Sequence, residues 1–99
     1  MADRREHWQE PATVISTGQV VTNAGARVQL NANLPCMVVS IAAKPANTGN
    51  VFLGDVTVTS ANGRILAPGA SIDIAIDNLN RIYLDVAVNG EGVSYMALS

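Results

Sequence analysis

Short apolar runs alternate with polar positions along most of this chain, and the clearest alternation lies near its C-terminal end. In residues 71–77, isoleucine occupies positions 72, 74 and 76, while Asp73 and Asp77 belong to the opposite set. A repeat of two places these two sets on opposite faces of a β-strand. The segment therefore predicts a half-buried strand whose aspartates face water.

Residues 81–88 repeat this alternation, and residues 93–97 continue it in a last strand. The apolar face of the first segment carries Ile82, Leu84, Val86 and Val88, and its other face carries Arg81, Tyr83, Asp85 and Ala87. In the last strand Tyr95 shares the phase of Val93 and Ala97, which predicts a core position for its ring. Asn89-Gly90 lies between the two strands and is typical of a tight hairpin turn, so we predict that they form an antiparallel pair.

Turn residues divide the rest of the chain into further short strands. Residues 67–70, Ala-Pro-Gly-Ala, predict a type II turn. Asn62-Gly63 predicts a hairpin that joins residues 56–59 to residues 64–66. A further pair is predicted around Asn23-Ala24-Gly25. Its strands are residues 19–22 and 27–30, and residues 37–43 and 51–53 are apolar runs of strand length.

These elements add up to an all-β fold of about eight or nine short strands, with no segment of helical period. Several strands carry apolar side chains on both faces, so two sheets must pack on each other. The sequence therefore predicts an antiparallel β-sandwich, and a jelly roll is one arrangement that fits.

The first twelve residues differ from the rest of the chain. They hold five of the fourteen charges, the single histidine and the single tryptophan. We therefore divide the chain into an N-terminal arm, residues 1–12, and one β-sandwich domain, residues 13–99. The arm is expected to be extended or to form a short helix, and its length allows a reach of about 40 Å. Its candidate partner-binding residues are Arg4, Arg5, His7 and Trp8. Trp8 is the strongest of them because a large apolar side chain is costly to leave in water. A frayed chain terminus is the alternative.

Composition and charge narrow the classes of function. A net charge of −2 disfavours binding to nucleic acid, which needs a broad basic surface. No apolar run is long enough for a membrane helix, and no signal peptide is visible, so synthesis in the cytosol is expected. His7 is the single histidine and Glu91 the single glutamate beyond Glu10. An enzyme, a metal site and a cofactor are therefore not expected.

A few residues of the body invite a chemical role, but a structural role is the better interpretation for most of them. Asp73, Asp77 and Asp85 are oxygen ligands of the kind calcium prefers, yet their alternation with apolar residues indicates the wet face of strands. Residues 77–80 are predicted to form a turn in which asparagine tolerates a left-handed conformation. Cys36 is expected to be a small buried hydrophobe. Tyr83 lies on a polar face and is a candidate for a subunit interface.

The order of several motifs resembles a known family. These motifs are Asn47-Thr48-Gly49-Asn50, Gly54-Asp55, Leu66-Ala67-Pro68-Gly69 and Asp77-Asn78-Leu79-Asn80-Arg81-Ile82-Tyr83. In this order they resemble a small β-sandwich domain of virion proteins of tailed bacteriophages. The resemblance covers about residues 13–98 and leaves the arm outside.

The resemblance implies a structural protein of the virion, in particular a decoration or cement protein on the outer capsid surface. The implied partners are the major capsid protein and copies of the chain itself, with a homotrimer favoured over a monomer ordered on the lattice. The expected location is the virion, after synthesis in the host cytoplasm. The alternative is a tail or fibre module that binds host-surface glycan.

Overall fold

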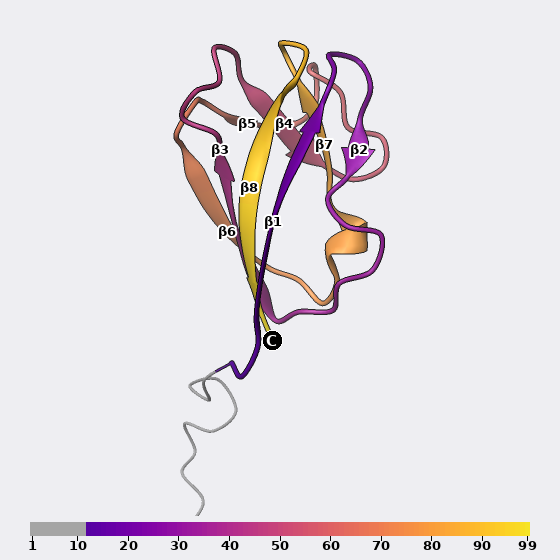
Figure 1. Ribbon diagram of the computed structural model, residues 1–99. Coiled ribbons are helices and arrows are strands. Elements are labelled where there is room, and N and C mark those ends of the chain that lie inside the picture. Colours follow the sequence, from indigo (N-terminus) through magenta and orange to yellow (C-terminus); the bar gives the residue numbers. More distant parts are fainter. Residues whose placement is uncertain (1–11) are drawn as a thin grey trace, which may run out of the picture.

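The computed structural model describes residues 12–99, which form two four-stranded antiparallel sheets packed face to face (Figure 1). Sheet I contains, in spatial order, β1 (Ile15–Thr22), β8 (Glu91–Leu98), β3 (Val38–Ala43) and β6 (Ser71–Ala75). Sheet II contains, in spatial order, β2 (Val28–Gln29), β7 (Tyr83–Val86), β4 (Val51–Gly54) and β5 (Arg64–Leu66). The predicted all-β sandwich is confirmed.

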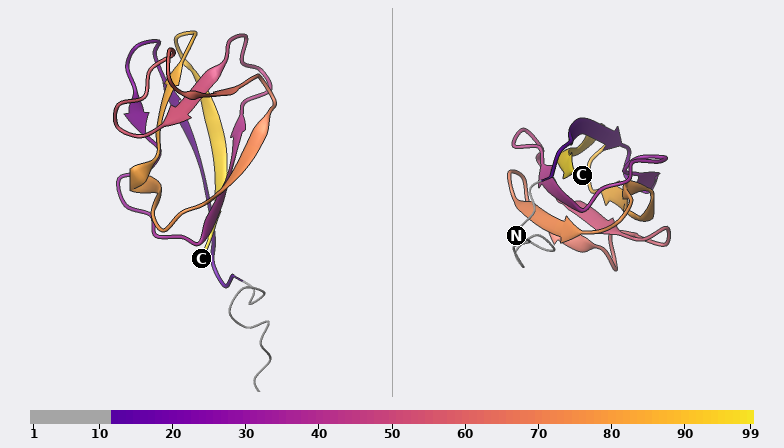
Figure 2. Two further views of the ribbon diagram at one scale, coloured as in Figure 1. Left: turned by 180° about the vertical axis from the view of Figure 1, so that it is seen from behind. Right: turned by 90° about the horizontal axis from the view of Figure 1, so that it is seen from below.

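The strand order of the two sheets is that of a jelly roll. Between residues 12 and 99 the chain passes from one sheet to the other at every connection except the one from β4 to β5. The views from behind and from below in Figure 2 show the two layers that result. Strands that are neighbours in sequence therefore face each other across the core and are rarely hydrogen-bonded.

The core lies between the sheets and is built from the alternating apolar positions of both. Strand β3 shows this pattern directly, because Val39, Ile41 and Ala43 are buried while the residues between them are only half-buried. From sheet II, Val51, Leu84 and Val86 join the same cluster. Each fully buried side chain of this size contributes about 1.5–3 kcal/mol, so this shared core is the main source of stability.

Two of the predicted turns have the expected local geometry. Gly69 has a φ of 80°, and Ala70 N–H donates to Ala67 C=O at 2.9 Å, which confirms the type II turn before β6. Gly90 also has a φ of 80°, as expected of a tight turn. The predicted pairing across Gly90 is wrong, however, because β7 belongs to sheet II and β8 to sheet I. Alternation shows which side chains face the core, but it is the same whether the next strand lies in the same sheet or in the opposite one.

Two further predicted pairs are also wrong. Residues 19–22 and 27–30 do not pair, because β1 bonds to β8 and β2 bonds to β7. Residues 56–59 form no strand. Asp55 Oδ1 accepts hydrogen bonds from the backbone N–H of Thr57 at 2.8 Å and from its hydroxyl at 2.6 Å, and this local turn replaces a strand. The partner of β5 is β4.

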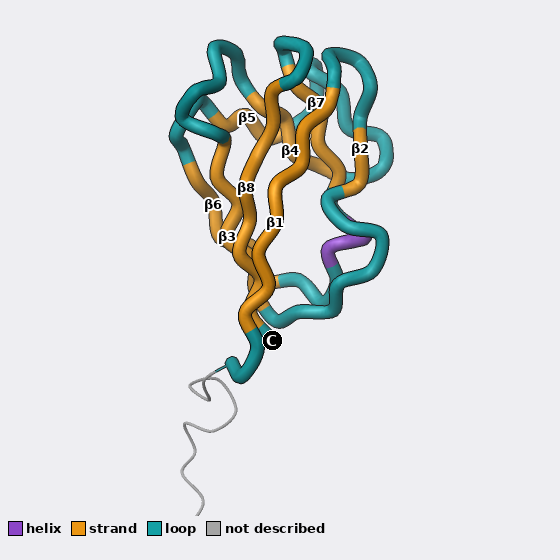
Figure 3. The backbone as a smooth tube through the Cα atoms, in the orientation of Figure 1, coloured by secondary structure: helices purple, strands orange, loops and turns teal. Residues whose placement is uncertain are grey.

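The segment after β4, residues 55–63, folds over the outer face of sheet II. Val58 is 2% exposed and Phe52 is 7% exposed, although Phe52 belongs to the outward set of β4. A Cβ atom on Gly63 would lie 2.6 Å from the Cβ of Phe52, so only glycine allows this close approach. Figure 3 draws this segment, like the other loops, in teal.

The prediction that Asp85 faces water is also wrong, because its carboxylate accepts hydrogen bonds from backbone N–H groups. Asp85 lies opposite Phe52 in the ladder and is only 5% exposed. Its Oδ1 accepts hydrogen bonds from the backbone N–H groups of Gly25 at 3.0 Å and Val86 at 2.8 Å. Asp73 and Asp77 are exposed, as predicted.

Residues 77–80 form a turn, but not of the predicted kind. They lead into a 3-10 helix, η1 (Leu79–Arg81), which is purple in Figure 3. Asn78 caps this helix by accepting a hydrogen bond from Asn80 N–H at 2.9 Å, and its φ of −159° is extended. The left-handed asparagine expected here is therefore wrong, because side-chain capping satisfies the backbone without it.

The buried acceptor of Asp85 leads to a first prediction. Asp85→Ala removes the side-chain acceptor of two backbone N–H groups, the buried one of Val86 and the part-buried one of Gly25, and should lower the free energy of unfolding by about 1–3 kcal/mol. The control is Asp73→Ala, which removes an exposed carboxylate of the same kind and should change stability by less than about 0.5 kcal/mol. Urea denaturation measures both values. Equal effects of the two substitutions would contradict the structural role of Asp85.

Candidate functional site

The outward-facing side chains of sheet I form three rows that run across its four strands. The registers of the strands fix these rows. They are Ile15, Leu98, Val38 and Ala75; then Thr17, Met96, Ser40 and Asp73; then Gln19, Ser94, Ala42 and Ser71. We call these twelve positions the open face.

The first row of the open face is apolar throughout. Ile15 is 68% exposed, and the neighbouring Val14 and Met37 are 50% and 56% exposed. Val14 N–H donates to Ser99 C=O and Met37 N–H donates to Leu98 C=O, so both residues lie at the same end of the sheet. Exposed apolar area gathered at one end of a sheet is typical of a surface that contacts another macromolecule.

The second and third rows are almost free of charge. Asp73 is the single charged residue of the open face. A depression of about 350 Å³ lies over the centre of these rows, lined by Thr17, Gln19, Ser40, Ala42, Ser94 and Met96. Small and uncharged side chains allow a partner to approach without the cost of desolvating charges.

The two sheets differ in what covers their outer faces. Residues 55–63 cover part of sheet II and bury Phe52 beneath Val58. On sheet I, Met96 keeps an exposed fraction of 44% although it lies on the central strand β8. Among residues 12–99, nothing covers the open face as residues 55–63 cover sheet II.

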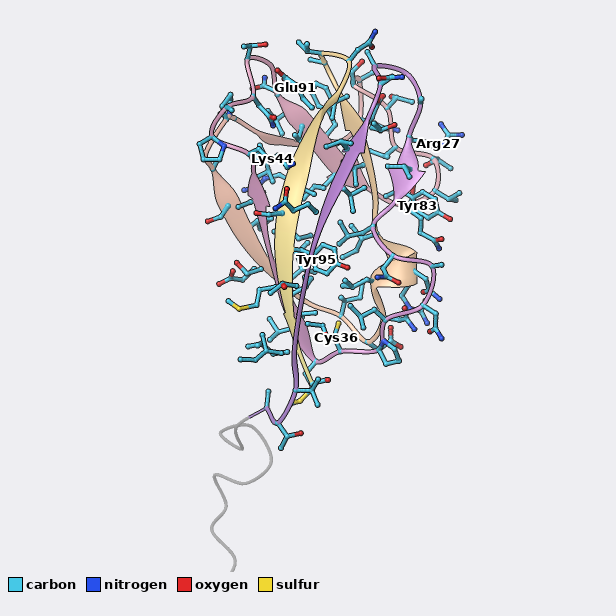
Figure 4. The ribbon with its side chains drawn as sticks, in the orientation of Figure 1. Arg27, Cys36, Lys44, Tyr83, Glu91 and Tyr95 are labelled. Atoms are coloured by element: carbon cyan, nitrogen blue, oxygen red, sulfur yellow. The ribbon has the colours of Figure 1, made fainter. Side chains whose placement is uncertain are left out.

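Tyr83, the interface residue expected from the sequence, does not fall on the open face. Tyr83 lies on the outer side of sheet II, half-buried between Gln29 and Gly54 in neighbouring strands. Figure 4 shows it near Arg27 on the β2 side of the molecule. The arm residues Arg4, Arg5, His7 and Trp8 lie outside the described residues.

Tyr95, in contrast, is buried in the core, as predicted. Its ring packs against Gly18 of β1, where a Cβ atom would lie 2.6 Å from the Tyr95 hydroxyl oxygen. Asn31 Nδ2 donates to that hydroxyl at 3.0 Å. The tyrosine thus supports β1 from the inner side of sheet I.

The sequence analysis missed the open face because it began the first strand at residue 19. In the structure β1 begins at Ile15, and residues 15, 17, 19 and 21 are all exposed. The period-two repeat of these exposed positions was the available signal, but it mixes apolar and polar side chains. It therefore resembles a loop more than a half-buried strand.

The carboxylate of Glu91 holds a loop in place. Its Oε2 accepts hydrogen bonds from the backbone N–H of Thr48 at 2.7 Å and from its hydroxyl at 2.9 Å, and its Oε1 accepts one from Gly49 N–H at 3.0 Å. These donors, the backbone N–H of Thr48 first, lower the pKa of Glu91 below its ordinary value of 4.5. Beside it, Asn47 Nδ2 donates to Gly92 C=O at 2.8 Å. Glu91 therefore fastens the loop of residues 47–50 to the start of β8.

Cys36 is buried, as predicted, and its Sγ donates to the carbonyl oxygen of Ile76 at 3.1 Å. Burial, and secondly the negative charge of Asp77, raise the pKa of the thiol above 9.0. The thiol is therefore protonated at neutral pH and is a weak nucleophile.

Residues 12–99 hold no group of three or more side chains placed to bind a metal ion. Over the same residues, no helix has the length and apolar character to cross a membrane.

No family model, curated protein or solved structure matches this chain. The geometry of residues 12–99 is therefore the basis for a functional assignment, and its most distinctive feature is the open face of sheet I.

The hydrogen bonds of the Glu91 carboxylate to Thr48 and Gly49 predict a pH dependence of stability. Because folding lowers the pKa of Glu91, its contribution is complete above about pH 4.5 and is lost as the pH falls through the folded pKa. Glu91→Gln should therefore lower stability at pH 7 and leave it closer to wild type at pH 3. Thermal unfolding of both proteins across this range measures the difference. A difference that stays constant with pH would refute the role of the carboxylate.

Proposed function

We propose that this chain is a non-enzymatic structural protein of a bacteriophage virion, a decoration protein that binds the outer surface of the capsid. The observation that carries the proposal is the open face of sheet I, an uncovered surface of apolar and uncharged polar side chains with one charged residue, Asp73. The turn motifs resemble those of virion proteins of tailed bacteriophages, and for this reason we propose a bacteriophage particle.

A nearly uncharged surface suits binding to a lattice. Each contact with the lattice removes apolar area from water at about 25 cal/mol per Å², and few charges have to be desolvated. Because a capsid repeats the same site many times, copies that also contact each other are held by several weak contacts at once. A modest apolar patch, such as the row from Ile15 to Ala75, is then sufficient for stable binding to the lattice.

The jelly-roll topology supports this class of function without deciding it. Viral capsid proteins use this fold, and so do lectins and cupins. The turn motifs of the resemblance also have defined structural roles here. Asn47, Thr48 and Gly49 are held by the start of β8, and residues 67–70 form the turn that carries the chain from sheet II to sheet I.

The proposal includes the N-terminal arm as a second contact. Residue 12 adjoins the apolar end of the open face, because the next residues, Thr13 and Val14, both donate to Ser99 C=O. An arm that leaves the domain at this end is well placed to bind the same partner as the open face. The proposed partners are the major capsid protein and copies of the chain itself, in the virion.

A tail or fibre module that binds host glycan is the alternative, and the amide side chains near η1 are its best candidate site. These amides already bond within the protein. Asn78 Nδ2 donates to Asn33 Oδ1 at 2.9 Å, and Asn78 Oδ1 accepts from Leu34 N–H and Asn80 N–H. Tyr83, the aromatic residue suited to stacking on a sugar, is half-buried elsewhere on sheet II. Decoration is therefore the better supported function.

A pair of matched substitutions tests the open face. Met96→Glu places a charge at the centre of the open face, and Ile65→Glu places one on β5 of sheet II, where the residue is similarly exposed at 56%. In co-sedimentation with purified capsids, Met96→Glu should weaken binding by about tenfold or more, since an unpaired charge in an interface costs at least about 1.4 kcal/mol. Ile65→Glu should bind as the wild type does. Equal binding by both variants would contradict the assignment of the face, and binding to a glycan array in place of capsids would favour the tail module.

Removal of the arm is a separate prediction. A protein that lacks residues 2–11 should fail to bind capsids, while its circular dichroism remains rich in β-structure, because the deletion keeps every member of the core cluster described for residues 12–99. The same co-sedimentation assay measures the loss. Undiminished binding by the shortened protein would remove the arm from the proposal and leave the open face as the sole contact.

A further inference from the structure

The edge strands of the two sheets differ in how they are protected. Strands β2 and β5, at the edges of sheet II, have two and three residues, and β6 has five residues and carries Asp73. Strand β1 has eight residues with no charge, no proline and a continuous register with β8. Proteins normally protect an edge by shortness, charge, proline or a bulge, because an unprotected edge pairs with other chains. Strand β1 has none of these protections.

The backbone groups that β1 presents at its free edge follow from its pairing with β8. Val14 and Ser99 exchange two hydrogen bonds, Val14 N–H to Ser99 C=O at 2.7 Å and Ser99 N–H to Val14 C=O at 2.9 Å. In an antiparallel ladder such pairs alternate, so the even-numbered residues of β1 bond to β8. Residues 15, 17, 19 and 21 therefore direct their N–H and C=O groups away from β8. Among residues 12–99, none of these groups has a hydrogen-bond partner.

We propose that β1 pairs antiparallel with β1 of a second copy of this chain, about a two-fold axis beside Gly18. In this register Ile15 lies opposite the second copy's Val21, and Thr17 lies opposite its Gln19. Apolar side chains then meet apolar ones, and polar side chains meet polar ones. Each of the four outward residues exchanges its free N–H and C=O with its opposite residue, as in an ordinary ladder.

Other registers of the same pair leave part of the edge of β1 unpaired. A shift of two residues in one direction leaves Val21 without a partner and places Thr17 opposite itself. A shift in the other direction leaves Ile15 without a partner and places Gln19 opposite itself. Strand β1 also carries no charge, so its pairing with a second copy brings no like charges opposite each other. The sequence of β1 is therefore complementary to itself in one register.

The pairing joins the two copies of sheet I into one sheet of twice the width. Their open faces lie on the same side of the joined sheet, because a two-fold axis perpendicular to a sheet keeps each face on its own side. Two open faces held together bind a repeating surface with higher avidity than either one. The inference extends the self-association part of the proposed function, and it is measured without any capsid, so each can fail independently of the other.

Charge substitutions at the edge test the register directly. The double variant Thr17→Lys/Gln19→Lys places lysine opposite lysine in both central pairs. The double variant Thr17→Lys/Gln19→Glu uses the same two exposed positions but places lysine opposite glutamate in both pairs. Neither variant changes a residue that bonds to β8, so both should fold as the wild type does, which circular dichroism and thermal unfolding verify.

Sedimentation equilibrium of the full chain measures the result. We expect the wild type to form dimers, the lysine–lysine variant to raise the dimer Kd by about tenfold or more, and the lysine–glutamate variant to restore dimerisation. In the dimer, hydrogen exchange should also slow at the amides of Thr17 and Gln19. A monomer at all concentrations, a trimer, or equal weakening by both variants would overturn the proposal. The trimer would instead point to a ring in which β1 meets another edge of the next copy.

Discussion

Burial of alternating side chains between two sheets is the constraint on which the rest of this structure depends. Val39 and Ile41 of sheet I meet Leu84 and Val86 of sheet II in a single apolar cluster. Because one face of each sheet is used in this way, each sheet has a second face that needs either its own cover or a partner. Sheet II receives a cover from residues 55–63, in which Val58 packs on Phe52. Within residues 12–99 nothing covers the outer face of sheet I in this way, and the proposed function rests on that difference between the sheets.

The sequence determines the elements of the fold more clearly than it determines their partners. The half-buried strand at Ile72 and Ile74, the type II turn at Gly69 and the core position of Tyr95 all depend on local alternation or local backbone preference, and all are confirmed. Hairpins across Gly90 and Gly25 were wrong, because a turn residue with positive φ suits a connection within a sheet and one between sheets equally well. Asp85 was misplaced because one donor to its carboxylate, the backbone N–H of Gly25, lies sixty positions earlier in the chain.

The open face could not be predicted from the sequence. Its rows join residues of four strands that are far apart in the chain, such as Ile15, Leu98 and Val38, and only the registers bring them together. Its chemical character is also weak in sequence, since serine, threonine and alanine positions carry no motif. Tyr83 was predicted to be a candidate interface residue because it is an aromatic residue on a polar face, but its strand belongs to the other sheet. The face and the unprotected edge of β1 belong to the same sheet, so the proposed capsid binding and the proposed self-association would use adjoining surfaces and need not compete.

Hydroxyl-radical footprinting of the protein, free and bound to capsids, tests the central claim most directly. Met96 lies on the open face and Tyr83 lies on the outer side of sheet II, and both side chains react readily with such radicals when they are accessible. The account predicts that capsid binding suppresses the oxidation of Met96 and leaves that of Tyr83 unchanged. Protection of Tyr83 with continued oxidation of Met96 would contradict it, because the capsid would then be bound through sheet II.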